Sequence, residues 1–550
     1  MVNQRKPMAA GAPEPLRPVE FSPRTEGPKA SRYMARAVSL HLDGKPEEAL
    51  RELQRAIAKG EKSAEIYSAM GHIQFELGQF EGGANSYREL LQLEPDHRTG
   101  WFNLAVCLER TGRWQEAADK FQKAFQVDPA RIEAQLGLGI CLLHLSQAQP
   151  ALAAFERCLA QDGENETALF GKSVALQLES HYDEAAELYR RVLKRNPQSQ
   201  ESLANLIAIG MAKKDYEMVR GYSERLLEVH PQSTAALEGL AAWASAGGDF
   251  EMAAKFCTLL VDAVPNHFEG WFNLALAHQK AGRHQQASEA YQQAIKVRPQ
   301  AAQAYTNLGI VRQELGALKE AKESYQQAVR LDSNAVPALW NLALVLEQSG
   351  EQDEAEKAYQ RVLDRDPENQ EARFRLGYVR LQRGDYRGSA EAFESCLKKR
   401  KEWLEAQMNL ALSYWKMGDR DLAQLVYEQA LNTDPKSLDA LRGLAALALE
   451  RGDLDQALEY HGRLVDLGER QAELLYNTGL LLQKSGQAEE AARLYRESLA
   501  ENPDFAEALL NMGHVMKSMG HEEDARACWA KALEAKPELA QGYFEPPAKN

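Results

Sequence analysis

The chain has 550 residues, a formal net charge of −15 and six cysteines, none of them in a CxxC pair. The acidic balance argues against a nucleic-acid partner, because binding to phosphate depends on Lys and Arg. No stretch approaches the roughly 18 apolar residues of a membrane span, and unpaired cysteines without a targeting segment favour a cytoplasmic protein.

The N-terminal segment, residues 1–29, contains six prolines and shows no helical period. Such a composition cannot bury enough apolar surface to order the backbone, so this segment is predicted to be a disordered tail. Three interpretations of its role stay open: a tether, a ligand for another domain, or a solvated end.

A 34-residue period occupies the chain from residue 30 to residue 539. Ten prolines lie at whole multiples of 34 from one another, namely Pro95, Pro129, Pro197, Pro231, Pro265, Pro299, Pro367, Pro435, Pro503 and Pro537. This grid defines fifteen repeats in register, 30–63, 64–97, 98–131 and so on to 506–539. An uninterrupted period of this length is typical of stacked supersecondary units, each of which buries its apolar face against its neighbours.

Each repeat is predicted to be a helical hairpin. We number its positions 1 to 34 and place the periodic proline at 32. Apolar residues at positions 4, 7, 8 and 11 follow helical spacing, and position 15 is Gly in twelve repeats, where positive φ ends a helix. A second helix then passes through positions 20, 24 and 27 and ends before the proline slot.

Two columns of the second helix differ in size. Position 20 is Ala in twelve repeats, and position 24 is aromatic in eleven, one helical turn later. Together with the apolar residues of the first helix they give W-x2-L-G/A-x2-Y, A-x3-F/Y-x2-A and P, nearly complete in residues 98–131. This pattern resembles the tetratricopeptide repeat family. The resemblance implies an all-α solenoid, a right-handed superhelix whose concave side is lined by the first helices.

One repeat and the C-terminal end depart from the pattern. Residues 200–233 carry Ile207 at position 8, Lys214 at 15, Val219 at 20 and Ser223 at 24, so the stack is predicted to be weakest there. A hinge and ordinary sequence drift both account for these changes. Residues 540–550 form a short tail that either covers the last helix or serves self-association through the C-terminal end.

A column of asparagines is the main candidate for a binding site. Position 6, expected on the concave face with positions 2, 5, 9, 12 and 13, is Asn in eight repeats: Asn103, Asn205, Asn273, Asn307, Asn341, Asn409, Asn477 and Asn511. Asn is disfavoured inside helices, and its amide can bind the backbone of an extended peptide. The column resembles that of O-linked N-acetylglucosamine transferases, where such asparagines hold substrate chains. Packing within the repeat is the alternative.

The neighbouring columns sharpen this placement. Position 5 is aromatic in six repeats, position 9 is mostly aliphatic and position 2 is acidic in nine. An apolar groove is one interpretation, and packing between the first helices of neighbouring repeats is the other. We place a partner peptide at Asn273, Asn307 and Asn341, flanked by Phe272 and Trp340.

No pattern of catalytic or metal-binding chemistry stands out. The stretch Phe170-Gly171-Lys172-Ser173 lacks the first glycine of a phosphate loop, and neither HExxH nor Cys/His zinc spacing occurs. We therefore expect no enzyme activity, no cofactor and no metal. The predicted function is a non-catalytic scaffold that binds extended or helical protein segments. The alternatives are a substrate-recognition subunit of an O-linked glycosyltransferase-like system and an assembly factor for a membrane or cell-surface machine.

Overall fold

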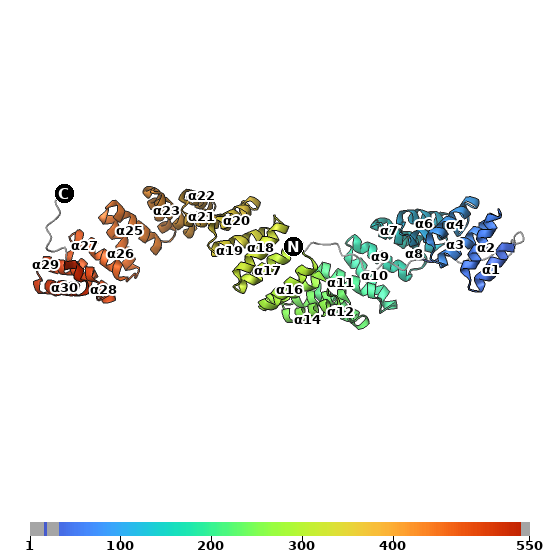
Figure 1. Cartoon of the computed structure of the whole chain (residues 1–550), viewed down its shortest axis with the longest axis horizontal. Helices are drawn as coiled ribbons and strands as arrows, with labels where there is room; N and C mark the ends of the chain where they lie inside the picture. Colours follow the sequence, from blue (N-terminus) through green and yellow to red (C-terminus); the bar gives the residue numbers. More distant parts are fainter. Residues whose placement is uncertain (1–15, 19–31, 541–550) are drawn as a thin grey trace. The chain divides into compact units, whose positions relative to one another are not determined.

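The computed structural model describes residues 16–18 and 32–540 (Figure 1). The chain divides into two compact units, Met1–Pro299 and Gln300–Asn550. The predicted disorder of the N-terminal tail lies outside the described residues, apart from residues 16–18. The role predicted for the C-terminal tail likewise lies outside them, apart from residue 540. Leu16 is half-buried and packs against the apolar cluster of the first four repeats.

The described residues of the first unit form sixteen α-helices: α1 (Arg32–Leu42), α2 (Pro46–Ala58), α3 (Ala64–Glu76), α4 (Phe80–Leu93), α5 (Gly100–Arg110), α6 (Trp114–Val127), α7 (Ile132–His144), α8 (Ala148–Gln161), α9 (Glu166–Leu178), α10 (Tyr182–Arg195), α11 (Gln200–Lys213), α12 (Tyr216–Val229), α13 (Thr234–Ala246), α14 (Phe250–Ala263), α15 (Phe268–Lys280) and α16 (His284–Val297). Within this unit, each helix from α1 to α15 packs against the next one along the chain.

The described residues of the second unit form fourteen α-helices and a terminal 3₁₀ turn: α17 (Ala302–Glu314), α18 (Leu318–Leu331), α19 (Val336–Gln348), α20 (Gln352–Arg365), α21 (Gln370–Arg383), α22 (Tyr386–Lys399), α23 (Leu404–Met417), α24 (Arg420–Thr433), α25 (Leu438–Arg451), α26 (Leu454–Asp466), α27 (Ala472–Lys484), α28 (Ala488–Glu501), α29 (Ala506–Ser518), α30 (Glu522–Ala535) and η1 (Pro537–Ala540). Consecutive helices again pack together. The prediction of an all-α solenoid of helix-turn-helix repeats is confirmed.

The turn inside each hairpin depends on a left-handed residue at position 15. All twelve glycines at this position have positive φ, from +72° at Gly44 to +90° at Gly418. The three repeats without the glycine keep the same backbone, with φ of 58° at Ser146, 67° at Ser180 and 58° at Lys214. A left-handed conformation costs roughly 1–2 kcal/mol for a residue with a Cβ, so these three turns are strained.

An aromatic ring at position 24 joins the two helices of a repeat to the next repeat. In repeat 3 (98–131) the buried Phe121 ring contacts Phe102 of its own first helix edge to face, with ring centroids 5.7 Å apart. On the other side, a Cβ at Gly137 of the next repeat would lie 2.5 Å from the Phe121 ring. The glycine at position 6 is therefore required by close packing against the preceding ring.

Repeat 6 (200–233) fills the same space with different side chains. Ser223 replaces the ring, and a Cβ at Gly239 would lie 2.4 Å from the Ser223 Oγ, 3.0 Å from Ile207 and 3.1 Å from Val219. The larger Ile207 and Val219 thus take up volume that the small serine leaves. The predicted hinge stays a prediction; the division into units falls at residues 299 and 300, outside this repeat.

All six cysteines are free thiols. Five of them are buried, and Cys528 is half-buried. Burial raises the pKa of Cys107 to about 12, so its thiol stays protonated and packs as a small apolar group. Among residues 16–18 and 32–540, no helix combines the length and the apolar character needed to cross a bilayer.

Candidate functional site

The eight position-6 asparagines do not share one environment. Asn103 and Asn205 are buried, and Asn103 lies beside Tyr87 of the preceding repeat. Asn273 and Asn477 are exposed, and the other four, Asn307, Asn341, Asn409 and Asn511, are half-buried. The solvent-accessible asparagines are therefore those from residue 273 onward.

Two of the half-buried asparagines donate hydrogen bonds within the protein. The Asn511 Nδ2 donates to the Tyr476 hydroxyl of the preceding repeat at 2.9 Å. The Asn409 Nδ2 donates to the Glu405 carbonyl oxygen of its own helix at 2.8 Å. In Asn409 the side-chain oxygen thus remains the group that can accept a hydrogen bond from a bound chain.

The aromatic residues at position 5 pack inside their own repeats. Phe272 contacts the Tyr291 ring with centroids 5.6 Å apart, and Trp340 contacts Tyr359 at 5.8 Å, both edge to face. The same pair of positions gives ring contacts in the four other repeats with an aromatic residue at position 5. These contacts join the first helix of a repeat to its own second helix, which differs from the predicted alternative of packing between neighbouring first helices.

A groove of about 460 Å³ lies in the second unit, between the first helices of repeats 12 and 13, α23 and α25. Both helices supply residues at positions 5, 6 and 9, α23 adds position 12 and α25 adds position 2. All of these positions belong to the columns expected to face a ligand. The lining residues are Met408, Asn409, Leu412, Trp415, Tyr427, Asp439, Arg442, Gly443 and Ala446. A volume in this range is typical of ligand pockets.

The polar rim of this groove is fixed by ion pairs. Arg442 pairs with Asp439 at 2.9 Å and also with Glu469, which lies in the loop between α26 and α27. The Trp415 Nε1 donates to Glu450 at 3.3 Å. These contacts hold a cationic group and an indole beside the apolar Leu412, so the groove combines apolar contact with hydrogen bonding.

The phenol of Tyr427 closes the groove toward the protein interior. Its side chain is buried, and a Cβ at Gly443 would lie 2.5 Å from the ring. Burial, with a further contribution from the Asp439 carboxylate, raises the pKa of Tyr427 to about 12. The groove therefore has a neutral aromatic wall at physiological pH.

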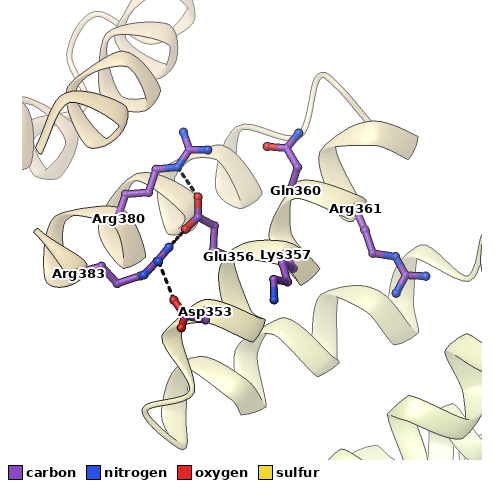
Figure 2. A pocket seen from close by; sticks show the side chains of 7 residues that line it. All are labelled: Asp353, Glu356, Lys357, Gln360, Arg361, Arg380 and Arg383. Atoms are coloured by element: carbon purple, nitrogen blue, oxygen red, sulfur yellow. Dashed lines mark hydrogen bonds and ion pairs between the residues drawn. The ribbon is translucent and has the colours of Figure 1, made fainter. Parts of the chain in front are cut away.

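A second, charged pocket of about 720 Å³ lies between α20 and α21, lined by Asp353, Glu356, Lys357, Gln360, Arg361, Arg380 and Arg383 (Figure 2). Arg380 Nε is 2.9 Å from Glu356 Oε1, and Arg383 pairs with both Asp353 and Glu356. Arg380 stands at position 11 of repeat 11 and Glu356 at position 21 of repeat 10, positions that are apolar in some other repeats, as at Leu142 and Ala118. We interpret this cluster as an ionic joint between repeats 10 and 11.

A column of amide side chains at position 12 was missed by the sequence analysis. Tyrosine hydroxyls at position 24 donate to Gln177, Gln279, Gln313 and Gln483 in their own repeats at 2.7–3.1 Å, and Tyr359 donates to Glu347 at 2.5 Å. The recurrence of Gln twelve residues before Tyr is the signal that could have found these bonds.

The predicted peptide position at Asn273, Asn307 and Asn341 is divided between the two units. Asn273 lies on α15 of the first unit, while Asn307 and Asn341 lie on α17 and α19 of the second. Within the second unit, Asn341 is half-buried, as is the neighbouring Trp340.

Comparison with family models identifies the repeat. One model described as a tetratricopeptide repeat matches residues 68–130, 151–200, 174–217, 272–336, 306–363, 341–401 and 408–471. Two further tetratricopeptide repeat models match residues 111–169 and 482–542, and residues 31–55. The chain belongs to the tetratricopeptide repeat family. A comparison with curated protein sequences gave no match.

Solved structures similar to this chain include other repeat proteins. YrrB, described as a tetratricopeptide repeat protein with an unusual peptide-binding site, is 22% identical, with a TM-score of 0.33, over 34% of this chain and 98% of its own. MamA is 21% identical, with a TM-score of 0.29, over 33% and 98%. A chain of the anaphase-promoting complex hetero-tetramer Cut9–Hcn1 is 16% identical, with a TM-score of 0.31, over 82% and 96%. The family assignment rests on the repeat models alone.

Proposed function

We propose that the chain is a non-catalytic scaffold that captures extended segments of other proteins along its first helices, with the groove between α23 and α25 as a principal contact. The observation that carries this proposal is the groove itself. Positions 5, 6 and 9 of two successive first helices line it together, so an elongated ligand that follows these helices contacts both repeats in the same register.

The chemistry of the groove suits a peptide backbone with one apolar side chain. Leu412 and Met408 provide apolar contact, and the side-chain oxygen of Asn409 can accept a hydrogen bond from a backbone N–H. Arg442 has a side chain that is 46% exposed despite its two ion pairs, so it can also contact an acidic side chain of the ligand. The exposed Asn273 and Asn477, which belong to the position-6 asparagine column, offer further contacts for a peptide within their own units.

A random dodecapeptide library displayed on phage tests this function. Selection on the full chain should enrich peptides that bind with measurable fluorescence anisotropy, and Leu412→Asp should weaken that binding at least tenfold by placing a carboxylate among apolar groups. Leu425→Asp is the matched control, because Leu425 is 50% exposed on α24, the second helix of the same repeat. Equal binding by both variants would contradict the placement.

The asparagines are tested with the selected peptides. Asn409→Ala should reduce affinity severalfold and leave helicity unchanged. A triple change of Asn273, Asn307 and Asn341 to Ala reports on the position predicted from the sequence. Unchanged affinity in both variants would show that the asparagine column does not bind the peptide, while the proposed groove between α23 and α25 would still stand.

The two other functional hypotheses stay predictions. Transfer of sugar from a sugar nucleotide, assayed with the purified chain alone and in cell lysate, distinguishes a glycosyltransferase-associated role from a scaffold. Affinity purification followed by mass spectrometry would reveal membrane or cell-surface machinery as partners and so identify an assembly factor.

A further inference from the structure

Three potential metal ligands from the first two repeats lie close together. His41 lies in the last turn of α1 in repeat 1, and His72 and Glu76 are four residues apart on α3 in repeat 2. His41 Nε2 is 3.6 Å from Glu76 Oε2, and His72 Nε2 is 3.3 Å from Glu76 Oε1. One ligand atom from each of the three side chains lies within 4.8 Å of the other two.

The distances from the two imidazole nitrogens to the two oxygens of the Glu76 carboxylate are close to those between neighbouring zinc ligands. Zinc binds imidazole nitrogen and carboxylate oxygen at about 2.0–2.2 Å in a tetrahedral arrangement, which separates neighbouring ligand atoms by about 3.4 Å. The two distances to the Glu76 carboxylate lie on either side of that value. Residues four apart on a helix share one face, so His72 and Glu76 are positioned together by α3 itself.

The other ring nitrogens support the same orientation. Within the described part of the chain, the Nδ1 atoms of His41 and His72 are buried and have no hydrogen-bond partner. The polar atom that each ring presents is therefore Nε2, and both Nε2 atoms face the same carboxylate. The ring centroids are 6.1 Å apart at an interplanar angle of 76°, so the two rings lie edge to face.

The three side chains are accessible enough to exchange an ion with solvent. The exposed fractions are 32% for His41, 16% for His72 and 43% for Glu76. We propose that His41, His72 and Glu76 bind a Zn²⁺ ion that links the first repeat to the second. Three protein ligands leave the fourth coordination position open to water.

Such an ion would stabilise the end of the array. Repeat 1 has a repeat on one side only, and its first helix, α1, has just two buried residues, Met34 and Ala37. Stability in an array depends on the interfaces between neighbouring repeats, so the outermost helix is expected to open most easily. A ligand that binds the closed form alone shifts the equilibrium toward it.

Calorimetric titration of the tag-free, chelator-treated full chain with ZnCl₂ tests the binding. We expect one saturable site in the wild type and at least tenfold weaker binding in His72→Ala and in Glu76→Gln. His181→Ala is the matched control, because His181 pairs with Glu184 at 3.5 Å and supplies no three-ligand cluster. Binding of equal strength in all four proteins would overturn the proposal, since the buried thiols or other surface groups would then hold the ion.

Hydrogen exchange tests the link between repeats independently. Zinc should slow amide exchange across Arg32–Leu42 at least tenfold in the wild type and leave it unchanged in His41→Ala. Circular dichroism shows whether this variant keeps its helicity. A wild-type α1 that exchanges at the same rate with and without zinc would also overturn the proposal, whatever the calorimetric result.

Discussion

Repeats 3 and 6 solve the same packing problem with different residues. Repeat 3 follows the family pattern and places the Phe121 ring against Phe102 and Gly137. Repeat 6 has Ser223 in place of the ring and larger residues at two neighbouring positions. In both repeats the space between successive hairpins is filled. The sequence pattern therefore reflects the total side-chain volume in this space more than the identity of any one residue.

The largest expected difference between the two repeats comes from removing the side chain at position 24. Phe121→Ala should destabilise repeat 3 by about 3–5 kcal/mol, because it leaves a cavity where a buried ring had been. Ser223→Ala should change stability by less than about 0.5 kcal/mol or increase it, since the buried hydroxyl has no hydrogen-bond partner among the described residues. Native-state hydrogen exchange in α6 and α12 measures both. Equal losses of stability in the two variants would contradict the conclusion that the two repeats fill this space with different side chains.

A buried carboxyl gives repeat 3 a pH dependence. Burial raises the pKa of Glu109 from 4.5 to about 7, so the folded chain binds more protons than the unfolded chain and loses stability as pH rises between these values. At pH 8, Glu109→Gln should therefore be more stable than the wild type by up to about 3 kcal/mol, with little difference at pH 4.

This effect is measured by urea denaturation at the two pH values, with unfolding monitored by amide hydrogen exchange in α5. The exposed Glu89→Gln on α4 is the control for removing one carboxylate from the protein surface. A gain that is the same at pH 4 and pH 8 would show that ionisation of Glu109 is not its cause.

Restoring the family aromatic in repeat 6 should be harmful. Ser223→Phe introduces a ring into space that Ile207 and Val219 already occupy, which predicts a loss of about 1–3 kcal/mol. The double change Ile207→Ala with Ser223→Phe should recover much of the loss, because the alanine makes room as Ala105 does in repeat 3. Thermal denaturation of the single and double variants checks the coupling, and a single variant of wild-type stability would show that unfilled space remains.

The smallest expected effect concerns the strained turn. Lys214→Gly should stabilise repeat 6 by about 1 kcal/mol, because lysine at φ 58° carries a cost that glycine avoids. The reciprocal Gly112→Lys in repeat 3, where φ is 74°, should lose a similar amount. Urea denaturation should show a higher free energy of unfolding for Lys214→Gly and a lower one for Gly112→Lys. A lower free energy of unfolding in both variants would contradict this account.

Much of the fold could be predicted because its determinants are local and repeat at a fixed spacing. The glycines at position 15 and the proline slots mark helix ends within one hairpin, and alternating small and large side chains mark the interface between the helices. Even the exceptional turns at Ser146, Ser180 and Lys214 keep the expected backbone. Neighbouring hairpins impose it despite the strain.

Features that depend on two repeats together were harder to predict. A position-6 residue contacts the preceding ring, so the environment of Asn103 depends on Tyr87 as well as on its own helix. The cluster of His41, His72 and Glu76 has no sequence motif, because its members occupy different positions in different repeats. The ion pair of Glu356 and Arg380 was missed for the same reason.

The contact between each position-24 ring and the next hairpin has a consequence for how such a chain can change in length. Removal of residues 98–131 would bring Tyr87 to face Gly137, which already accommodates the ring of Phe121. The new interface between repeats 2 and 4 would resemble the two interfaces that were lost with repeat 3. Whole modules can thus be gained or lost during evolution or by design, whereas loss of a few residues would misalign everything downstream.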